Sequence, residues 1–409
     1  MKIIDLTEFY SERGGVRTHL DQKGRILRRL GHEHVIIAPG LKDEVSDLPP
    51  VDVEARGSAR VHRVAGPTLP YDPNYHLLWR LDKVGRIVRR EEPHVLQINS
   101  PYLAALALRG TSARSAGIKT FWWHADVIDT YAVERLRPIL GEARSATVVR
   151  PLWGWMRSIA AGCDATFAAS QHQVDKLREH DMPRVRLMPF GIDKDLFSPD
   201  ARSDAWRAGV TVGPPGAPIF VAVGRLSVEK QWPVLLEAFI RFRSSREARL
   251  VIFGEGPERA RLEQQVSGRD DVAFMGFERD PRKIATALAS ADAFVHGCPF
   301  ETFGLSVAQA IACGLPIVVP DRGGAAELAR PELAEVYASS DAEAFAAALD
   351  RLVRRDPGEL RSAAIRGRAS IFSATDQVEH TVEAYRELLR ESRKTHGDRR
   401  NSFADPDVS

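Results

Sequence analysis

Short apolar runs alternate with amphipathic helical stretches along nearly the whole chain, and this alternation constrains the fold more than any other feature. The first series of apolar runs lies near residues 2–6, 34–38, 61–65, 94–98, 118–123, 164–169 and 185–189. The second series lies near residues 219–223, 249–253, 272–276, 293–296 and 317–320. Continuously apolar strands separated by helices are typical of parallel sheets that helices cover on both faces. The sequence therefore predicts an α/β protein with two doubly wound domains.

The expected joint between the two domains lies within residues 197–218, where proline, glycine and other turn-forming residues concentrate. A chain of 409 residues is also too long for a single hydrophobic core. We therefore expect a first domain over residues 1–198 and a second domain over residues 199–375. A helix over residues 376–392 is predicted to close the first domain, and the polar tail 394–409 is predicted to be disordered.

The composition is that of an ordinary globular enzyme, with 44% apolar residues, 27% charged residues and a net charge of +2. This balance gives no reason to expect a nucleic acid as a partner. The three cysteines, Cys163, Cys298 and Cys313, lack metal-ligand spacing and favour a reducing, cytoplasmic location. Met1 leads directly into a strand-like run, and no apolar stretch approaches the roughly 20 residues of a membrane span. We therefore expect no signal peptide, and any membrane role should be peripheral.

The most informative segment is the one that carries Glu301. The apolar run 293–295 is predicted to be a buried strand, and the loop after it contains this single acid. A helix is predicted to open near Gly304, and a second apolar strand follows at residues 317–319. An acid beside free N–H groups at a helix N-terminus suits a ligand that is both polyhydroxylated and anionic.

Two cations follow the first strand of the second series. Arg225 comes just after the apolar run 219–223, and Lys230 lies five positions further along, where a helix is expected to begin. Two cations in such places can bind a diphosphate and stabilise the charge that grows as it leaves. Alone they are equally well explained as solvated surface charges, but beside the Glu301 loop a role in binding is favoured.

Three further positions in the second half are weaker candidates for contacts with such a ligand. Gly254 and Gly256 follow the apolar run 249–253 and allow a close approach of the backbone to a ligand. A tight strand-to-helix turn explains these glycines at least as well. Met275 is a candidate neighbour of a nucleobase, although apolar residues that end a strand usually belong to the core.

The first half contributes two candidate positions. Gly14 and Gly15 stand between the first strand and a helix that is expected to start near Val16, where the backbone can approach a phosphate or a sugar. A simple turn is the commoner explanation of such a dipeptide. His124 ends the run 118–123 and is well placed to point into a cleft, although a lone histidine is more often structural. The fingerprint G-x-G-x-x-G is absent, which disfavours a dehydrogenase.

Asp193 and Asp195 form an acid–x–acid pair of the kind that can hold a divalent metal bridging phosphates. They lie at the expected domain joint, far along the chain from the candidate phosphate-binding residues. We therefore interpret the pair as a capping turn and expect no metal there.

In this order, the motifs resemble the retaining glycosyltransferases of family 4 (glycosyl transferases group 1), which have the two-domain, Rossmann-like fold called GT-B. The resemblance covers roughly residues 2–392, and the ordered set is specific although each motif alone is weak. Its landmarks are Gly14-Gly15-Val16, His124, Phe190-Gly191-Ile192-Asp193, Gly224-Arg225-Leu226-Ser227-Val228-Glu229-Lys230, Gly254-Glu255-Gly256-Pro257, Glu301-Thr302-Phe303-Gly304-Leu305 and Gly323-Gly324. It implies that the two domains face each other across a central cleft.

The resemblance also implies roles for the candidate residues. The second domain would bind a nucleotide-diphosphate sugar as co-substrate, and the first would receive the acceptor, with no essential metal or other cofactor. Arg225 and Lys230 would bind the diphosphate, Glu301 would hydrogen-bond the sugar hydroxyls, and His124 would lie near the transferred sugar. Backbone close to the donor would come from Gly14, Gly15, Phe303, Gly304 and Leu305.

One position departs from the family pattern, in which a second acid follows the first after seven intervening residues. Gln309 stands there instead. In relatives this acid accepts hydrogen bonds from the ribose, and glutamine keeps the carbonyl acceptor but loses the charge. The expected cost is about 1 kcal/mol, a several-fold loss of affinity. We therefore expect an active hexosyltransferase that retains the anomeric configuration without a paired-carboxylate double displacement.

The acceptor is expected to be a glycan, a lipid or a small molecule. Basic residues gather on residues 25–29 and on a stripe within 80–90, and residues 150–157 place tryptophans between arginines. Such pairings suit a lipid headgroup boundary, so we consider peripheral contact with an anionic membrane, on the inner face of the cell membrane. An ordinary solvated helix face with core tryptophans is slightly favoured over this interpretation.

Two other functions remain open at this point. Sugar-nucleotide 2-epimerases share the two-domain architecture, but they should place several acids around the sugar for proton removal. A catalytically weakened subunit that only binds a nucleotide sugar is the second alternative, and Gln309 is its only support.

Overall fold

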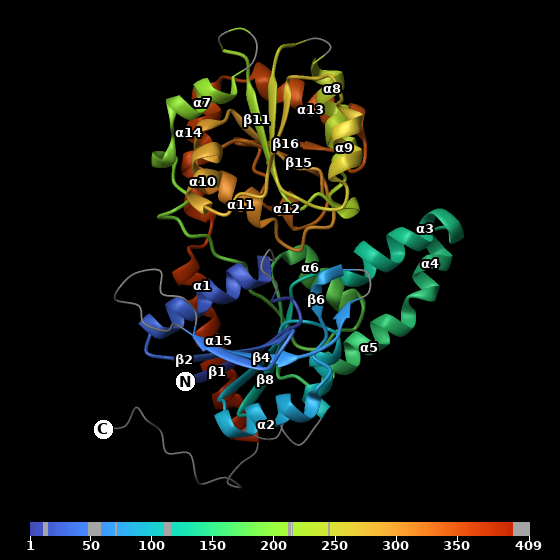
Figure 1. Ribbon diagram of the computed structural model, residues 1–409, viewed down its shortest axis with the longest axis vertical. Coiled ribbons are helices and arrows are strands. Elements are labelled where there is room, and N and C mark those ends of the chain that lie inside the picture. Colours follow the sequence, from blue (N-terminus) through green and yellow to red (C-terminus); the bar gives the residue numbers. More distant parts are fainter. Residues whose placement is uncertain are drawn as a thin grey trace.

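The computed structural model describes residues 1–10, 15–47, 59–69, 72–109, 116–211, 214, 216–243 and 246–395. These residues form two α/β domains, each built around a mainly parallel sheet with helices on both faces (Figure 1). The predicted fold class is therefore confirmed. Gly14 and the tail 396–409 lie outside the described residues.

The sheet of the first domain has eight strands in the order β10-β9-β8-β7-β1-β2-β4-β3 among the described residues. The strands are β1 Lys2–Leu6, β2 Glu33–Gly40, β3 Glu44–Asp47, β4 Arg60–Ala65, β7 Val95–Ile98, β8 Ile118–Trp123, β9 Ala165–Ala168 and β10 Val185–Leu187. All neighbours pair in parallel except β3, which runs antiparallel to β4. A short hairpin of β5 Thr68–Leu69 and β6 Asp72–His76 lies beside it.

Helices connect these strands. The main ones are α1 Gly15–Arg29, α2 Leu81–Glu91, α3 Glu134–Leu140, α4 Glu142–Val148, α5 Arg150–Ala161 and α6 Gln171–Glu179, with shorter turns η1 Leu103–Arg109 and η3 Ile128–Val133. Apolar residues recur at helical spacing over residues 77–91, which predicts a helix from about residue 77, but α2 begins at Leu81. Leu77 N–H instead donates to Pro67 O at 3.0 Å, and Trp79 N–H donates to Leu77 O at 2.9 Å, so the first turn of the expected helix does not form.

In the part of the chain that the structure describes, the second sheet has six parallel strands in the order β13-β12-β11-β14-β15-β16. They are β11 Ile219–Val223, β12 Arg249–Phe253, β13 Val272–Gly276, β14 Ala293–Val295, β15 Ile317–Pro320 and β16 Ala334–Tyr337. The helices are α7 Asp204–Val210, α8 Trp232–Arg243, α9 Arg259–Gln265, α10 Pro281–Ser290, α11 Leu305–Ala312, α12 Gly324–Glu327, α13 Ala342–Arg354 and α14 Pro357–Gly367, together with η4 Pro199–Ala201, η5 Val228–Lys230 and η6 Arg368–Ser370. The edge strand β16 was not predicted from the sequence.

The chain crosses between the domains twice, and the two crossings run side by side. Ile192 N–H donates to Phe372 O at 2.9 Å, and Ala374 N–H donates to Ile192 O at 3.0 Å. A Cβ on Gly191 would lie 2.2 Å from Ser373 O, so only glycine allows this contact. The second crossing leads into α15 Ala374–Thr395, which packs against α1 and β8 of the first domain (Figure 1). The predicted closing helix is therefore present and extends beyond its expected ends.

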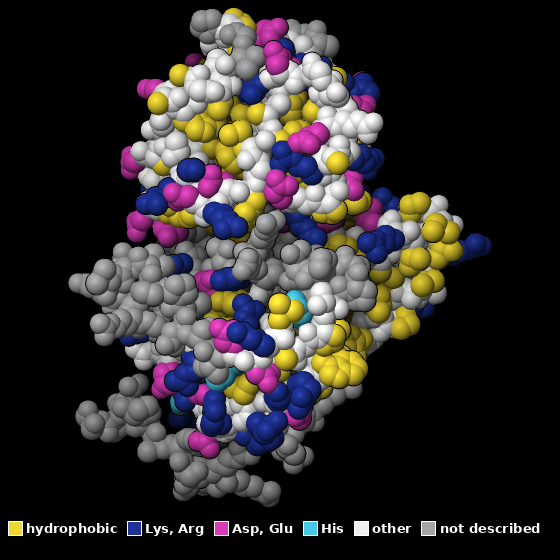
Figure 2. All heavy atoms as spheres, in the orientation of Figure 1, with side chains coloured by type: hydrophobic (Ala, Val, Ile, Leu, Met, Phe, Trp, Pro, Cys, Tyr) yellow, Lys and Arg dark blue, Asp and Glu magenta, His cyan; other side chains and the backbone are white. Residues whose placement is uncertain are grey.

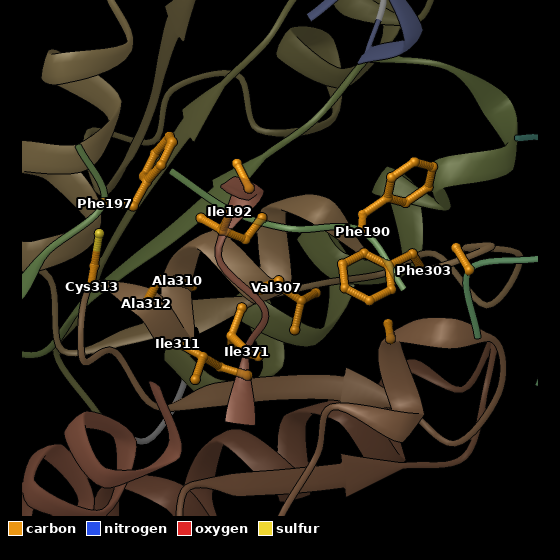
Figure 3. Packing of buried hydrophobic residues seen from close by; sticks show 14 of the residues in the cluster. Phe190, Ile192, Phe197, Phe303, Val307, Ala310, Ile311, Ala312, Cys313 and Ile371 are labelled. Carbon is orange, nitrogen blue, oxygen red and sulfur yellow. The ribbon is translucent and has the colours of Figure 1, made fainter. Parts of the chain in front are cut away.

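A buried apolar cluster joins the first crossing to the second domain. Phe190, Ile192 and Phe197 pack with residues of α11 and its preceding loop (Figure 3). The rings of Phe190 and Phe303 meet edge to face with their centroids 5.7 Å apart. Because Phe303 precedes α11 and Phe190 follows β10, this contact lies close to the facing edges of the two sheets.

Candidate functional site

The C-terminal ends of central strands from both sheets meet at the interface between the domains. Thr302, which follows β14, donates its hydroxyl to the backbone oxygen of His124, which follows β8, at 2.9 Å. A Cβ built on Gly15 at the start of α1 would lie 4.0 Å from Leu305 Cδ1 at the start of α11. The structure thus brings together Gly15, His124 and the 301–305 loop, as the resemblance implied.

The centre of the site in the second domain is a half-buried ion pair. Lys230 Nζ lies 2.5 Å from Glu301 Oε1, and the two side chains are 23% and 17% exposed. His296 Nε2 lies 3.3 Å from the same carboxylate oxygen. Both contacts are therefore made to Oε1 of Glu301.

The two charges stabilise each other against burial. Burial raises the pKa of Glu301, but Lys230 outweighs this effect, and the pKa lies below its usual range. Burial lowers the pKa of Lys230, but Cys298 and Glu301 outweigh it and raise the pKa above its ordinary value. Burial also raises the pKa of the Cys298 thiol to about 12, so this group is neutral near pH 7. The effective partner of Lys230 is therefore the Glu301 carboxylate.

The loop that carries Glu301 is held by glycines that no other residue could replace without strain. Gly304 has φ +95° and precedes α11, and a Cβ there would lie 3.2 Å from Ala325 Cα. Gly323 has φ +77°, and a Cβ on Gly324 would lie 2.6 Å from Phe303 Cα. Gly324 N–H donates to Glu301 O at 2.7 Å. The turn after β15 thus packs against the Glu301 loop and holds it in position.

Arg225 follows β11, and its side chain is exposed beside the loop that leads to Lys230. Its backbone oxygen accepts a hydrogen bond from Trp232 Nε1 at 2.8 Å, which anchors the loop to α8. A Cβ on Gly254 would lie 1.8 Å from Gly224 O, and a Cβ on Gly256 would lie 2.2 Å from Leu226 O. Close packing against the Arg225 loop therefore explains these glycines, and their contact with a donor stays a prediction.

The remaining donor-site candidates lie on β13, on α11 and in the loop before α11. Met275, near the end of β13, is 50% exposed and can contact a ligand. Gln309 is half-buried on α11, one helical turn beyond the half-buried Leu305. Phe303 is only 7% exposed and packs on Phe190, so its side chain is structural and only its backbone is available to a ligand.

His124 belongs to a buried polar network under the cleft. Its Nε2 lies 2.8 Å from Asn99 Oδ1, and Asn99 Nδ2 donates to Asp5 Oδ1 at 2.8 Å. Asp5 at the end of β1 also accepts from Lys23 Nζ at 2.8 Å and lies 2.6 Å from His34 Nε2. Asp5, Lys23 and His34 have fully buried side chains.

This network determines how His124 can act. Burial, followed by the nearby His19, lowers the pKa of His124 well below its ordinary value, so the imidazole is neutral near pH 7. Because the Asn99 amide group donates to Asp5, its oxygen faces His124. The neutral ring then donates from Nε2 and keeps Nδ1 as an acceptor.

A second polar contact joins the two domains. Glu327 of α12 accepts hydrogen bonds from the backbone N–H groups of Gln171 and His172, which open α6. A cavity of about 540 Å³ lies beside this contact and is lined by His172, Asp321, Arg322, Gly323, Ala326 and Glu327. The sequence did not single out Glu327, because a carboxylate that binds a helix start in another domain leaves no local pattern.

Asp193 accepts the backbone N–H groups of Asp195 at 3.2 Å and Leu196 at 3.1 Å. It therefore occupies a capping turn, as expected from its position at the joint. Within the described residues, a different group offers metal-ligand atoms: those of His296, Cys298 and Glu301 lie within 4.8 Å of one another. Lys230 already lies against Glu301 there, and its positive charge opposes a second cation.

His296 is the main site residue that sequence reasoning missed. Its ring is 6% exposed, and Nε2 finds no well-oriented hydrogen-bond partner among the described residues. Its backbone oxygen accepts from Tyr337 Oη at 2.8 Å, which ties it to β16. The available signal was its place directly after β14, five residues before Glu301.

The tryptophans of residues 150–157 lie within the first domain. Trp153 is 3% exposed and stacks on Trp123, with ring centroids 5.8 Å apart. Trp155 Nε1 donates to Pro101 O at 2.9 Å. Core packing, the slightly favoured interpretation, therefore holds for these tryptophans.

Comparison with known proteins gives two family matches. Residues 13–196 match a family model described as Glycosyltransferase Family 4, and residues 217–355 match one described as Glycosyl transferases group 1. Between them, the two matches contain Gly14, Gly15, His124, Arg225, Lys230, Glu301 and Gln309.

The similar proteins include two mannosyltransferases of Mycobacterium tuberculosis. A GDP-mannose-dependent alpha-mannosyltransferase is 33% identical over 309 residues, which cover 75% of each chain. A GDP-mannose-dependent alpha-(1-6)-phosphatidylinositol dimannoside mannosyltransferase is 29% identical over 377 residues, covering 91% of this chain and 93% of the relative. The fold is similar to that of a sucrose-phosphate synthase from Thermosynechococcus elongatus, with a TM-score of 0.76 and 20% identity over 96% of this chain and 100% of that one.

Proposed function

The chain belongs to glycosyltransferase family 4, and from that premise we propose that it transfers a mannosyl unit from GDP-mannose to a lipid-borne acceptor. Transfer of a hexose from a nucleotide sugar is the function common to its relatives, and this chain is a glycosyltransferase. The GDP-mannose donor is supported by two relatives that are named for it. The lipid acceptor is supported by one of them, named for a phosphatidylinositol dimannoside.

The observation that carries the proposal is the pairing of Lys230 with Glu301 at the start of α11. An ammonium that is held charged next to a carboxylate provides both halves of a sugar-diphosphate site. The cation binds the diphosphate, and the carboxylate accepts hydrogen bonds from sugar hydroxyls. Arg225 is exposed on the neighbouring loop and adds a second positive charge to the diphosphate side.

The chemistry follows from these charges. As the bond between the sugar and the phosphate lengthens, negative charge grows on the departing diphosphate, and Lys230 and Arg225 stabilise it. The acceptor hydroxyl attacks from the same face, which retains the anomeric configuration, and the departing phosphate takes its proton. The neutral His124 offers Nδ1 as an acceptor to a hydroxyl of the transferred sugar.

We expect this reaction to need no metal ion, because the charged Lys230 lies at the position that we assign to the diphosphate and can neutralise it. The expected result is full transferase activity in excess EDTA. Activity that disappears in EDTA and returns with Mg²⁺ or Mn²⁺ would contradict this part of the proposal.

His296 is predicted to hold Glu301 in place when Lys230 turns to the diphosphate. The side chains of Lys230 and His296 both lie against Oε1 of Glu301. His296 therefore remains as a partner of Glu301 after Lys230 has bound the diphosphate. We expect His296→Ala to weaken binding of GDP-mannose about tenfold and to leave binding of GDP unchanged, since GDP has no sugar for Glu301 to contact. Isothermal titration with both ligands measures the two effects.

His296→Gln serves as the conservative control, because its amide can still donate to Glu301. It should recover part of the lost affinity. Equal losses for GDP and GDP-mannose in His296→Ala would indicate damage to the whole domain rather than a role at the sugar.

The donor is tested by thermal shift with GDP-mannose, UDP-glucose and ADP-glucose. A ligand at 100 times its Kd stabilises the folded state by about 2.7 kcal/mol, which raises Tm by several degrees. We expect a rise with GDP-mannose and none with the other two at equal concentration. A rise with UDP-glucose alone would overturn the proposed donor.

The acceptor is tested by incubating the enzyme with radiolabelled GDP-mannose and bacterial membrane lipids. Label should appear in the organic phase, and the coupling constants of the product should show the anomeric configuration of the donor. Label that remains in GDP-mannose or in free mannose would remove the lipid acceptor from the proposal.

Within the residues that the structure describes, no helix combines the length and apolar character needed to cross a bilayer. Access to a lipid would therefore depend on contact at the membrane surface.

A further inference from the structure

Two short helices project from the body of the first domain. α3 and α4 form a hairpin that extends away from both sheets, and α5 leads the chain back (Figure 1). The hairpin begins soon after His124. Only η3 and a short loop separate it from the end of β8, which faces the cleft. We define the projecting tip as residues 135–152.

The tip carries large apolar side chains that are exposed. Ile139 is 78% exposed, Val148 is 54% exposed and Leu152 is 44% exposed. Figure 2 shows hydrophobic side chains gathered over this projecting part of the molecule. Such a concentration on one projection is unusual for a surface that faces only water.

The charges on the tip are mostly positive, although Arg137 pairs at 3.1 Å with Glu134, the first residue of α3. It contains four arginines, Arg135, Arg137, Arg144 and Arg150, and one acid, Glu142. All five side chains belong to exposed residues. Apolar side chains bordered by arginines are the composition of helices that lie in the headgroup region of a bilayer.

The base of the hairpin is anchored, so the tip is presented in a defined orientation. Lys176 of α6 forms ion pairs with Asp126 and Asp129, which precede α3. On the return side, Trp153 stacks on His180 with centroids 3.7 Å apart. These contacts fix both ends of the projection to the first domain.

We propose that the tip, residues 135–152, docks the enzyme on an anionic lipid surface. The apolar side chains enter the headgroup boundary, and the arginines bind the lipid phosphates. The docked hairpin would hold the first domain, with His124, close to the membrane. The inference deepens the proposed function, since a lipid-borne acceptor requires such an approach, but docking itself needs neither donor nor turnover.

The test is co-sedimentation of the full chain with vesicles of phosphatidylglycerol and phosphatidylcholine at low salt. The variant is Ile139→Glu with Val148→Glu, which places acids where apolar groups should enter the bilayer. Ile365→Glu is the control, because Ile365 is also an exposed apolar residue, at 44% exposure, but lies on α14 of the second domain. We expect the double variant to lose at least tenfold in vesicle binding and the control to bind like the unmodified chain.

A second variant tests the charges. Arg144→Gln with Arg150→Gln should weaken binding to anionic vesicles several-fold and respond less to added salt. The substituted residues are exposed, so Tm should stay within about a degree in both variants.

Three outcomes would overturn the proposal. The first is no vesicle binding by the unmodified chain, and the second is equal binding by the double variant. The third is a dimer in light scattering that the double variant abolishes without any vesicle binding, which would assign the tip to contact between two copies. A GDP-mannose thermal shift is measured on the same samples. Vesicle binding without that shift would contradict the proposed donor and leave the docking surface standing.

Discussion

Replacing Glu301 by glutamine is expected to lower kcat by about a hundredfold or more. The substitution keeps the shape of the side chain but removes the charge that holds Lys230 and accepts the sugar hydroxyls. Groups that stabilise developing charge in a water-poor site have effects of this size. The measurement is steady-state transfer from GDP-mannose, together with a melting curve. Lys230→Ala should give a similar loss, because the departing diphosphate loses its main cation.

The structure adds a stability effect to this prediction. Removing either partner leaves the other charge half-buried without its oppositely charged neighbour, so the free energy of unfolding should fall by about 1–3 kcal/mol. A matched control is Glu335→Gln, since Glu335 is 16% exposed and pairs with Arg351 but lies on the edge strand β16. The control should lose stability without losing activity. Near-normal turnover in Glu301→Gln would refute the assigned site.

Replacing Asp5 by alanine is expected to cause the largest loss of stability in the first domain. Asp5 is fully buried and accepts from Lys23, Gln97 and Asn99, while His34 lies 2.6 Å away. Without it, the buried ammonium of Lys23 has no counter-charge. Breaking one side of such a pair costs about 3–5 kcal/mol. Urea unfolding followed by tryptophan fluorescence reports the change, because Trp122 and Trp123 lie in the same domain.

A double variant separates the charge effect from general damage. Asp5→Ala with Lys23→Met removes both charges and should recover much of the lost stability. If the double variant is no more stable than Asp5→Ala alone, the ion pair is not the source of the effect. Because Asn99 also orients His124, both variants should lower activity even where they remain folded.

The same pair predicts how stability depends on pH. Burial raises the pKa of Asp5, but Lys23 and His34 outweigh it and lower the pKa far below its usual value. The stabilisation is therefore complete above the pKa of an unfolded aspartate, about 4. It is lost as the pH falls from there toward the lowered pKa of the folded chain. Asp5→Ala should remove this part of the acid dependence.

Much of the fold was predictable because it depends on the local periodicity of apolar residues. Continuous apolar runs predicted the central strands of both sheets, and their alternation with helices predicted parallel pairing. Prediction failed where contacts with residues that are distant in the sequence decide the structure. The edge strand β16 is paired on one side only, and α2 starts late because Leu77 bonds to Pro67 across a turn.

The candidate site was predictable where residue type and position along a strand coincide. Glu301, Arg225 and Lys230 follow strands whose ends meet at one edge, and the structure places Lys230 against Glu301. His296 was missed because one histidine near a strand end has no distinctive pattern. The glycines at 254 and 256 pack so closely against residues 224–226 that this contact alone requires glycine, and their contact with a donor stays a prediction.

The sequence by itself determined the class of fold, the two-domain plan and the family, because these depend on apolar periodicity and on the order of motifs along the chain. Only the tertiary structure decided which charges face each other. Lys230 and Glu301 are 71 positions apart, and Asp5 and Asn99 are 94 positions apart. The exposed apolar side chains of the projecting hairpin could not be predicted from the sequence either. Whether a side chain is exposed depends on what packs around it in the folded protein and not on its residue type.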